Sequence, residues 1–234
     1  MGTTAREMEK HAMADTMDLK GPRLGRPAGE ADALIILLHG LGADGNDLIG
    51  LAPHFAQALP GAAFVSPHAP YPCDMAPFGR QWFSFQVHDP AAVLNGVRAA
   101  AVHLNAFIDK ELETFALAED RLALVGFSQG TMMALHVGLR RARPCAAVIG
   151  YSGGLIAPEL LPAEIASRPP VLLVHGEADE VIDFDAMAAA QAALKANEVA
   201  VRTIARAGLG HAIDEVGLAA GTAMLRDSLG GESL

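Results

Sequence analysis

Six short apolar segments recur along the chain and predict the strands of a buried sheet. The first, residues 33–38, reads Ala-Leu-Ile-Ile-Leu-Leu and is followed by His39 and Gly40. An uninterrupted apolar run of this length is typical of a strand that is buried on both faces. Similar runs occupy residues 63–66, 122–125, 146–149, 171–174 and 199–204. The last run alternates more with polar residues, so we expect it nearer an edge of the sheet.

Helical periodicity fills the intervals between these segments. In three intervals apolar side chains recur at spacings of three and four, which places them on one face of a helix. These stripes are Val97, Ala101, Leu104, Ile108 and Leu112; Met132, Leu135 and Leu139; and Met187, Ala190 and Leu194. Strands that alternate with helices predict parallel pairing through right-handed crossovers. The fold class we expect is therefore α/β, a three-layer sandwich with a mostly parallel sheet and helices on both faces.

The chain divides into a short N-terminal segment and one domain. Residues 1–20 are polar and aperiodic, and we expect them to form a poorly ordered extension. The first thirty residues as a whole resemble a tail, in which the Gly- and Pro-rich stretch 20–29 predicts loop or extended chain. Because residues 31–230 contain no repeat or linker, we expect residues 21–234 to fold as a single domain without a large lid domain.

The composition excludes several classes of binding partner but says less about the fold. The 234 residues include 17 Lys and Arg against 27 Asp and Glu, a formal charge of −10. Without a local basic patch, such a chain repels phosphate backbones, so nucleic acid is not an expected partner. Two cysteines are too few for a disulfide framework or a cysteine-rich zinc site. With no apolar run of about 18 residues and no signal-peptide core, we expect a cytoplasmic monomer or homodimer without membrane insertion.

The strongest local motif is Gly126-Phe127-Ser128-Gln129-Gly130. It lies between the apolar run 122–125 and a helical segment that begins near residue 131. A strand, a sharp turn and a helix are what a nucleophile elbow requires, because they hold the serine out at the edge of the sheet. The motif alone equally allows a serine in a loop that caps the next helix. Its chemistry therefore depends on finding a base and an acid.

The candidate base and acid lie further along the chain. In this fold their order is serine, acid, histidine, and of nine histidines only His211 lies downstream of the carboxylates that follow the run 171–174. Composition does not choose among those carboxylates, which are Glu177, Asp179, Glu180, Asp183 and Asp185. Asp179 lies where a tight turn leaves the strand end, whereas Asp183 or Asp185 suits the cap of the following helix. We therefore favour Asp179 as the acid.

Acyl transfer also needs hydrogen-bond donors for the oxyanion. The backbone N–H of Gln129, at the start of the helix after the serine, is one candidate. The Gly-rich loop 39–45 after the first strand offers a second, the N–H of Leu41. Neither a phosphate-loop signature nor a dinucleotide signature is present, so this loop does not predict nucleotide binding.

Together these motifs resemble the α/β-hydrolase superfamily, and more narrowly the carboxylesterase/phospholipase family that includes acyl-protein thioesterases. The stretches that carry the resemblance are residues 38–48, 126–130, His175-Gly176 with Asp179, Gly210-His211, and Arg80-Gln81-Trp82-Phe83. The resemblance covers roughly residues 20–230. It implies Ser128, Asp179 and His211 as the catalytic triad and Leu41 and Gln129 as the oxyanion hole. One departure is Glu180, where relatives commonly carry Pro.

The implied function is a serine hydrolase that cleaves carboxylic esters, and thioesters as a further option, of short to medium acyl chains through an acyl-enzyme. No metal or organic cofactor is expected, since His39 and His175 follow strands without a third ligand at useful spacing. Two alternatives stay open. One is a hydrolase fold kept as a receptor or binding protein without turnover, and the other is an amidase or perhydrolase that uses the same triad.

Segment 69–88 is long for a connection and rich in aromatic and apolar side chains. Long loops of this composition are more often functional than passive. We expect Trp82 to line the site beside the oxyanion loop, with Phe127 as a second substrate-binding residue and part of the segment as the wall of an acyl pocket. The alternative is that Trp82 and its neighbours only form a satellite core.

Overall fold

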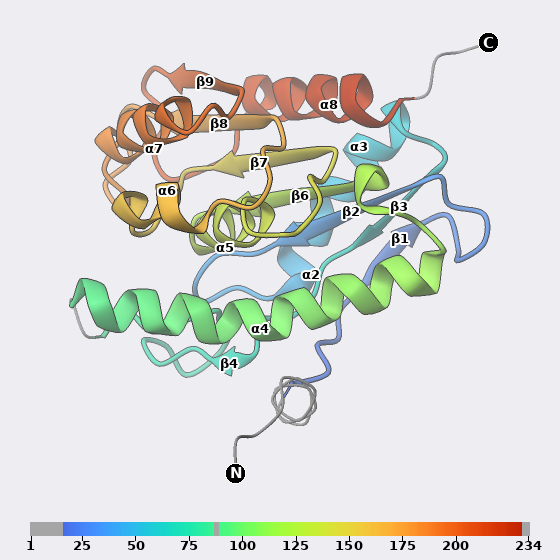
Figure 1. The fold of residues 1–234 in the computed structure, drawn as a ribbon, viewed down its shortest axis with the longest axis horizontal. Helices are drawn as coiled ribbons and strands as arrows, with labels where there is room; N and C mark the ends of the chain where they lie inside the picture. Colours follow the sequence, from blue (N-terminus) through green and yellow to red (C-terminus); the bar gives the residue numbers. More distant parts are fainter. Residues whose placement is uncertain (1–15, 87–88, 231–234) are drawn as a thin grey trace.

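A seven-stranded sheet forms the centre of the computed structural model, which describes residues 16–86 and 89–230 (Figure 1). The strand order is β1-β3-β2-β6-β7-β8-β9. The strands are β1 (Arg23–Gly25), β2 (Ala33–Leu38), β3 (Ala62–Val65), β6 (Leu122–Phe127), β7 (Ala147–Tyr151), β8 (Val171–Gly176) and β9 (Val201–Arg206). All neighbours pair in parallel except β1, which runs antiparallel to β3 at one edge. The predicted mostly parallel α/β sheet is confirmed.

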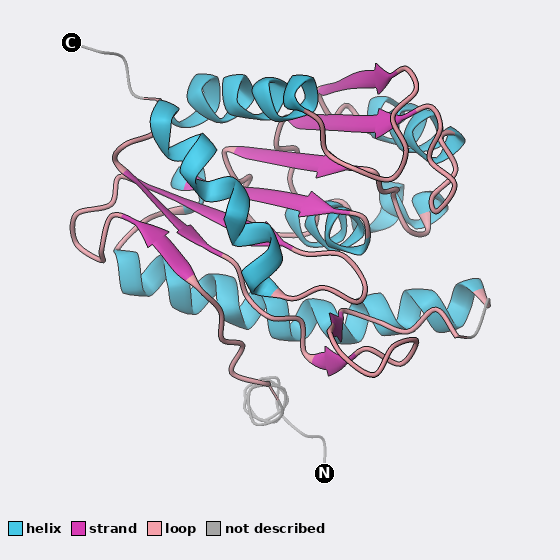
Figure 2. Cartoon of the chain, turned by 180° about the vertical axis from the view of Figure 1, so that it is seen from behind, coloured by secondary structure: helices cyan, strands magenta, loops and turns pink. Residues whose placement is uncertain are grey.

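Helices cover both faces of this sheet. The longer ones are α3 (Ala52–Ala58), α4 (Pro90–Phe115), α5 (Gln129–Gly138), α7 (Asp185–Ala196) and α8 (Glu215–Leu229); the short α2 (Gly45–Leu48) and α6 (Leu161–Glu164) complete the set, with 3-10 turns at Ile49–Leu51, Glu119–Arg121 and Pro158–Leu160. On β2, Leu34, Ile36 and Leu38 pack toward the side of α4, α5 and α7, whereas alternate residues pack toward α3 and α8. Figure 2 shows α3 and α8 crossing the second face. Because every residue of β2 is buried, its sequence is continuously apolar.

The edges of the fold differ from the sequence prediction. Within the stretch predicted as loop or extended chain, residues 23–25 form β1, which is too short to show a periodicity and is held by its pairing with β3. Leu19 is buried against the core, and Lys110 on α4 pairs with Asp18, so packing begins earlier than residue 21. The rest of the predicted extension, residues 1–15, lies outside the described residues. The C-terminal helix α8 was not predicted, because only a few of its side chains are buried.

Two strands end later than their apolar runs. β6 continues through Gly126 and Phe127, and β8 continues through His175 and Gly176. The segment 69–86 contains a small two-stranded sheet, β4 (Tyr71–Pro72) and β5 (Arg80–Gln81). As a result Ser128 directly follows β6, and the predicted acid turn begins where β8 ends.

By length and composition alone, helix α4 is long and apolar enough to cross a membrane. Its buried face, however, is the predicted stripe from Val97 to Leu112, and this stripe packs on the sheet side of the helix. Exposed charged residues such as Arg98, Asp109 and Lys110 occupy other positions of the same helix. The apolar stripe is therefore explained by packing. The cytoplasmic location and the oligomeric state stay predictions.

Candidate active site

Ser128 occupies a strained turn between β6 and α5. Its backbone has φ 54° and ψ −117°, a region that side-chain-bearing residues rarely adopt. The Ser128 N–H donates to Tyr151 O at 2.9 Å, and the Ser128 carbonyl accepts from Thr131 N–H at 3.0 Å. Strain of this kind costs on the order of 1–3 kcal/mol and persists only where the surrounding structure holds it. The turn is therefore the sharp strand-to-helix connection that the sequence predicts.

The glycines on either side of this turn allow strand and helix to approach closely. A Cβ at position 126 would lie 2.3 Å from the carbonyl oxygen of Gly130. A Cβ at position 130 would lie 1.8 Å from the carbonyl oxygen of Leu38 on β2. Atoms that are not bonded to each other cannot approach this closely, so both positions require glycine for packing rather than for flexibility.

Asp179 lies in the turn after β8 with its side chain fully buried (0% exposed). Its Oδ1 accepts from the backbone N–H groups of Val181 and Ile182, both at 2.9 Å. Its Oδ2 lies 2.8 Å from Nδ1 of His211. Burial acts to raise the pKa of this carboxyl, but the donors from Ile182, His211 and Val181 outweigh it, so its pKa lies below the ordinary value. Asp179 is therefore held as a carboxylate aimed at the imidazole.

His211 lies beside the turn that carries Ser128. Its ring centroid is 4.8 Å from that of Phe127, the residue immediately before the serine. The carbonyl of the next residue, Ala212, accepts from Ser152 Oγ at 3.5 Å, and Ser152 follows the strand that binds Ser128 N–H. The three residues predicted as a triad thus gather at the carboxyl edge of the sheet, where α/β folds place their sites. Phe127, predicted to bind substrate, is half-buried between this ring and the oxyanion loop.

The loop predicted to supply the Leu41 oxyanion donor, residues 39–45 and called the oxyanion loop below, lies against the serine: a Cβ on Gly40 would be 3.3 Å from that of Ser128. His39 is fully buried, and its Nε2 accepts from Ala69 N–H at 3.0 Å, so the proton of the neutral ring is on Nδ1. Nδ1–H then donates to Gly40 O at 2.7 Å. Because a trans peptide points its C=O and N–H in opposite directions, this bond fixes the direction of the Leu41 N–H. The second predicted donor, Gln129 N–H, lies in the first turn of α5, where backbone N–H groups lack intrahelical acceptors.

Trp82 supports this loop from inside the protein. It is 0% exposed, and its indole N–H donates to His39 O at 3.0 Å. Its backbone N–H donates to Oε1 of Gln129 at 2.8 Å, and Nε2 of Gln129 donates to Phe83 O at 2.7 Å. These contacts favour a supporting role for Trp82 over the predicted role in the wall of an open pocket. They also give the Gln129 side chain a role that the sequence did not indicate.

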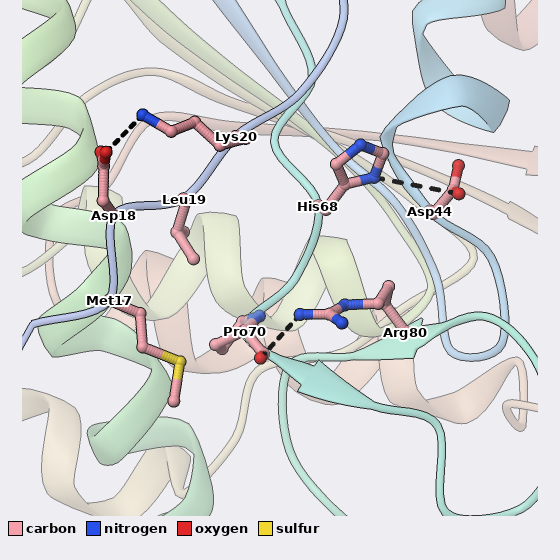
Figure 3. Close-up of a pocket in the computed structure, with 8 residues that line it drawn as sticks. All are labelled: Met17, Asp18, Leu19, Lys20, Asp44, His68, Pro70 and Arg80. Atoms are coloured by element: carbon pink, nitrogen blue, oxygen red, sulfur yellow. Dashed lines mark hydrogen bonds and ion pairs between the residues drawn. The ribbon is translucent and has the colours of Figure 1, made fainter.

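A cavity of about 470 Å³ lies behind the oxyanion loop, between the N-terminal segment and Arg80 (Figure 3). Its charged groups are engaged within the protein. Lys20 pairs with Asp18, and His68 faces Asp44 at 3.9 Å. Arg80 donates to the carbonyls of Ala69 and Pro70, both at 2.8 Å. His68 Nδ1 also accepts from Gly45 N–H at 3.1 Å, so residues that line the cavity join the connection after β3 to the oxyanion loop. Within residues 16–86 and 89–230, no three His, Cys, Asp or Glu side chains gather in a way that could hold a metal ion.

Known proteins resemble this chain over most of its length. A sequence model of the phospholipase/carboxylesterase family matches residues 20–228. The chain is 31% identical over 195 residues to esterase YpfH of Escherichia coli K12, covering 80% of this chain and 79% of the relative. It is 28% identical to acyl-protein thioesterase 1 of Neurospora crassa, covering 76% of this chain and 80% of the relative.

Solved structures point the same way. The crystal structure of esterase PE8 superposes with a TM-score of 0.87 at 41% identity, covering 91% of this chain and 100% of that one. Acyl-protein thioesterase 2 of Zea mays gives a TM-score of 0.73 at 26% identity, covering 89% of this chain and 99% of that one. The chain therefore belongs to the phospholipase/carboxylesterase family and is a carboxylesterase-type hydrolase with the α/β-hydrolase fold.

Proposed function

We propose that this hydrolase cleaves carboxylic esters of short to medium acyl chains through Ser128, His211 and Asp179, with acyl thioesters as second substrates. The observation that carries the proposal is the 2.8 Å contact between His211 Nδ1 and the buried Asp179 carboxylate, beside a serine in strained backbone conformation. The names of its relatives, esterase and acyl-protein thioesterase, support the substrate class.

In the proposed mechanism, His211 accepts the proton of Ser128 at Nε2 while the serine Oγ attacks the ester carbonyl. Asp179 keeps the Nδ1–H tautomer in place and stabilises the imidazolium that forms. The N–H groups of Leu41 and Gln129 stabilise the oxyanion of the tetrahedral intermediate. His211 returns the proton to the departing alcohol or thiol, which leaves the acyl group on Ser128. Water, activated by the same imidazole, then hydrolyses this acyl-enzyme.

The acyl chain has a candidate binding site next to this chemistry. An apolar cavity of about 660 Å³ is lined by Phe85, Pro90, Ala91, Val93, Leu94, Leu155, Ile156, Ala157, Pro158 and Glu159. A volume of this size is within the range of small-molecule sites. Both of its walls are anchored to the serine turn. On one side, Gly153, two residues before Leu155, lies close to the Ser128 carbonyl, since a Cβ there would be 2.7 Å from that oxygen. On the other side, the ring of Phe83 packs on that of Phe85 with centroids 5.0 Å apart, and the Phe83 carbonyl accepts from the Gln129 side chain.

The test of the reaction is Ser128→Ala, compared with the parent chain on p-nitrophenyl esters from acetate to octanoate and on acyl thioesters of the same lengths. We expect a loss of about 10⁴-fold or more in kcat/KM with an unchanged unfolding temperature, and loss of labelling by a fluorophosphonate. A parent chain that neither turns over these substrates nor reacts with the probe would instead be a receptor or binding protein. Retained turnover in the folded variant would remove Ser128 as the nucleophile.

The acyl site is tested separately with Phe85→Ala. Each buried methylene contributes about 0.8 kcal/mol, which is about fourfold in kcat/KM until the cavity is full. We expect Phe85→Ala to change the shape of the chain-length profile. The matched control is Phe78→Ala, which removes the same ring from a position that is 75% exposed. A profile that is scaled uniformly in both variants would place the acyl chain elsewhere.

A further inference from the structure

A second imidazole contacts the same carboxylate oxygen as His211. His175 is the second-to-last residue of β8. Its Nε2 lies 3.2 Å from Oδ2 of Asp179. The same Nε2 lies 2.9 Å from the carbonyl oxygen of Ile182, at the far side of the turn. Side-chain exposure is 1% for His175 and 0% for Asp179, so water does not mediate or compete for these contacts. His175 thus bridges the strand end, the acid and the end of its turn.

The neighbours of His175 fix where its proton lies. A carbonyl oxygen only accepts hydrogen bonds, and Asp179 Oδ2 also accepts when the carboxyl is ionised. A bare Nε2 facing two acceptors would leave buried lone pairs in mutual contact, so Nε2 carries the hydrogen. It donates this hydrogen to Ile182 O at 2.9 Å and lies 3.2 Å from Asp179 Oδ2. The ring edge also meets Phe184 in a perpendicular contact, with the centroids 6.0 Å apart. His175 is therefore an N–H donor with a fixed ring plane.

We propose that His175 is a positioning residue for the hydrolase reaction, which fixes the Asp179 carboxylate so that its Oδ2 stays directed at His211. The inference rests on the proposed function of Asp179 and His211. Oδ1 binds two backbone N–H groups, and Oδ2 binds the imidazole of His211 with the Nε2 of His175 3.2 Å away on the same oxygen. Contacts on both oxygens leave the carboxylate one orientation.

The contact also limits how strongly the carboxylate attracts a proton on His211. The positive end of an N–H dipole 3.2 Å from Oδ2 stabilises negative charge there, so removing it leaves more of that charge for the His211 imidazolium. The other charged groups near the turn point to solvent or are paired. Glu177, Glu180 and Asp183 are exposed, and Arg206, whose carbonyl accepts from the Glu177 N–H, pairs with Asp214 at 2.8 Å. His175 is thus the buried donor available to tune the acid.

The experiment compares His175→Leu with His175→Gln in the full chain, with p-nitrophenyl butyrate as substrate. For His175→Leu we expect kcat to fall about 10- to 100-fold with little change in KM. Losses of this size follow when a side chain that orients a metal ligand is removed, and His175 orients the acid in a comparable way. The acidic limb of the kcat/KM profile, which reports the His211 imidazole, should move to higher pH. The amide N–H of Gln reaches the place of Nε2–H, so His175→Gln should restore most of kcat and move the limb back.

Controls separate this role from packing and from the proposed function itself. His136→Leu removes another buried imidazole, on α5, from a position outside the site, and should leave kcat and the acidic limb unchanged. A His175→Leu variant that is less stable but keeps the parent kcat and limb would overturn the inference, as would a Gln variant no better than Leu. If His175→Leu does not fold, Gln is compared with Asn, which is too short to reach Oδ2, and equal kcat values overturn it. If the parent chain shows no Ser128-dependent turnover, the proposed function fails instead.

Discussion

The oxyanion loop and the acid turn follow two strands of the same sheet, yet they are held differently. The acid turn, residues 177–182, is closed largely by local contacts: Asp179 binds the N–H groups of Val181 and Ile182, and His175 at the end of β8 binds Ile182 O. Two bonds from further along the chain, to the carbonyls of Arg206 and Leu209, join its first residues to the next strand and loop. The oxyanion loop is held from elsewhere in the chain. Ala69 N–H, Arg80 N–H and O, and the Trp82 indole all bond to residues 39–43.

Because of this difference, the two regions should respond differently to substitutions. A turn that is closed by neighbours in sequence keeps its shape wherever its strand ends, so substitutions there should act on the chemistry of the acid. A loop that depends on contacts from three distant residues should respond to changes thirty or more residues away in the chain. The predictions below test whether the two regions behave this way.

The largest effect is expected within the acid turn, for Asp179→Asn. The amide preserves the shape of the turn but cannot stabilise the imidazolium and favours the wrong tautomer, so kcat should fall about 10⁴-fold with little change in the unfolding temperature. Asp183→Asn is the matched control, because Asp183 is exposed and caps the turn before α7 through Asp185 N–H. Steady-state kinetics on one p-nitrophenyl ester measures both. A larger loss for Asp183→Asn would move the acid to that residue.

The same contrast explains what the sequence could and could not predict. The six parallel strands and helices α4, α5 and α7 could be predicted because continuous apolar runs and helical stripes are local signals. The elbow and the acid turn were readable because their key groups lie next to strand ends. The supports of the oxyanion loop were not, since no local pattern relates Ala69 or Arg80 to residue 42. The edge strand β1 escaped prediction for the same reason, because its pairing with β3 defines it.

The next effect should come from the oxyanion loop, where His39 makes two separable bonds. His39→Asn places an amide N–H near Nδ1, and His39→Gln places an amide oxygen near Nε2. Because the Nδ1–H bond to Gly40 O orients the Leu41 N–H, we expect His39→Gln to lose about 100- to 1,000-fold in kcat, the cost of one oxyanion donor. His39→Asn should lose far less. Equal losses would mean that the Ala69 contact, and not the peptide orientation, sets the activity.

Acid should destabilise the fold through its buried histidines, one of them in the oxyanion loop, before it affects the acid turn. Burial lowers the pKa of His39, and burial with Arg140 lowers the pKa of His136 to about 4. Below about pH 6.5 the unfolded chain therefore binds protons that the folded chain does not, and stability falls as the pH falls. Between about pH 6.5 and 4 the His136 shift alone removes roughly 3 kcal/mol. The pKa of Asp179 lies below the ordinary 3.8, so its contribution is lost only at lower pH.

Urea unfolding at about pH 7, 6 and 5 measures this difference, with each buried histidine contributing at most about 1.4 kcal/mol per pH unit. We expect His136→Leu to flatten the pH dependence, since its Nδ1 is buried without a partner among the described residues and its loss as a polar group costs little. Adding His39→Asn should flatten it further. If the double variant kept the parent slope, the acid sensitivity would belong to other groups.

The smallest effect on activity is expected for Trp82→Phe, which distinguishes a supporting role for Trp82 from a role in the wall of the acyl pocket. Trp82→Phe keeps most of the buried ring but removes the indole N–H that binds His39 O, leaving a buried carbonyl without its donor. Such a loss costs about 1–3 kcal/mol of stability, so the unfolding temperature should fall. Because the contact acts on the oxyanion loop from behind, kcat/KM should drop less than about tenfold, uniformly from acetate to octanoate esters. The profile should keep its shape, in contrast to Phe85→Ala. A changed chain-length optimum in Trp82→Phe would instead return this residue to the wall of the acyl pocket, as the sequence predicted, and would show that the core beneath the oxyanion loop also contacts substrate.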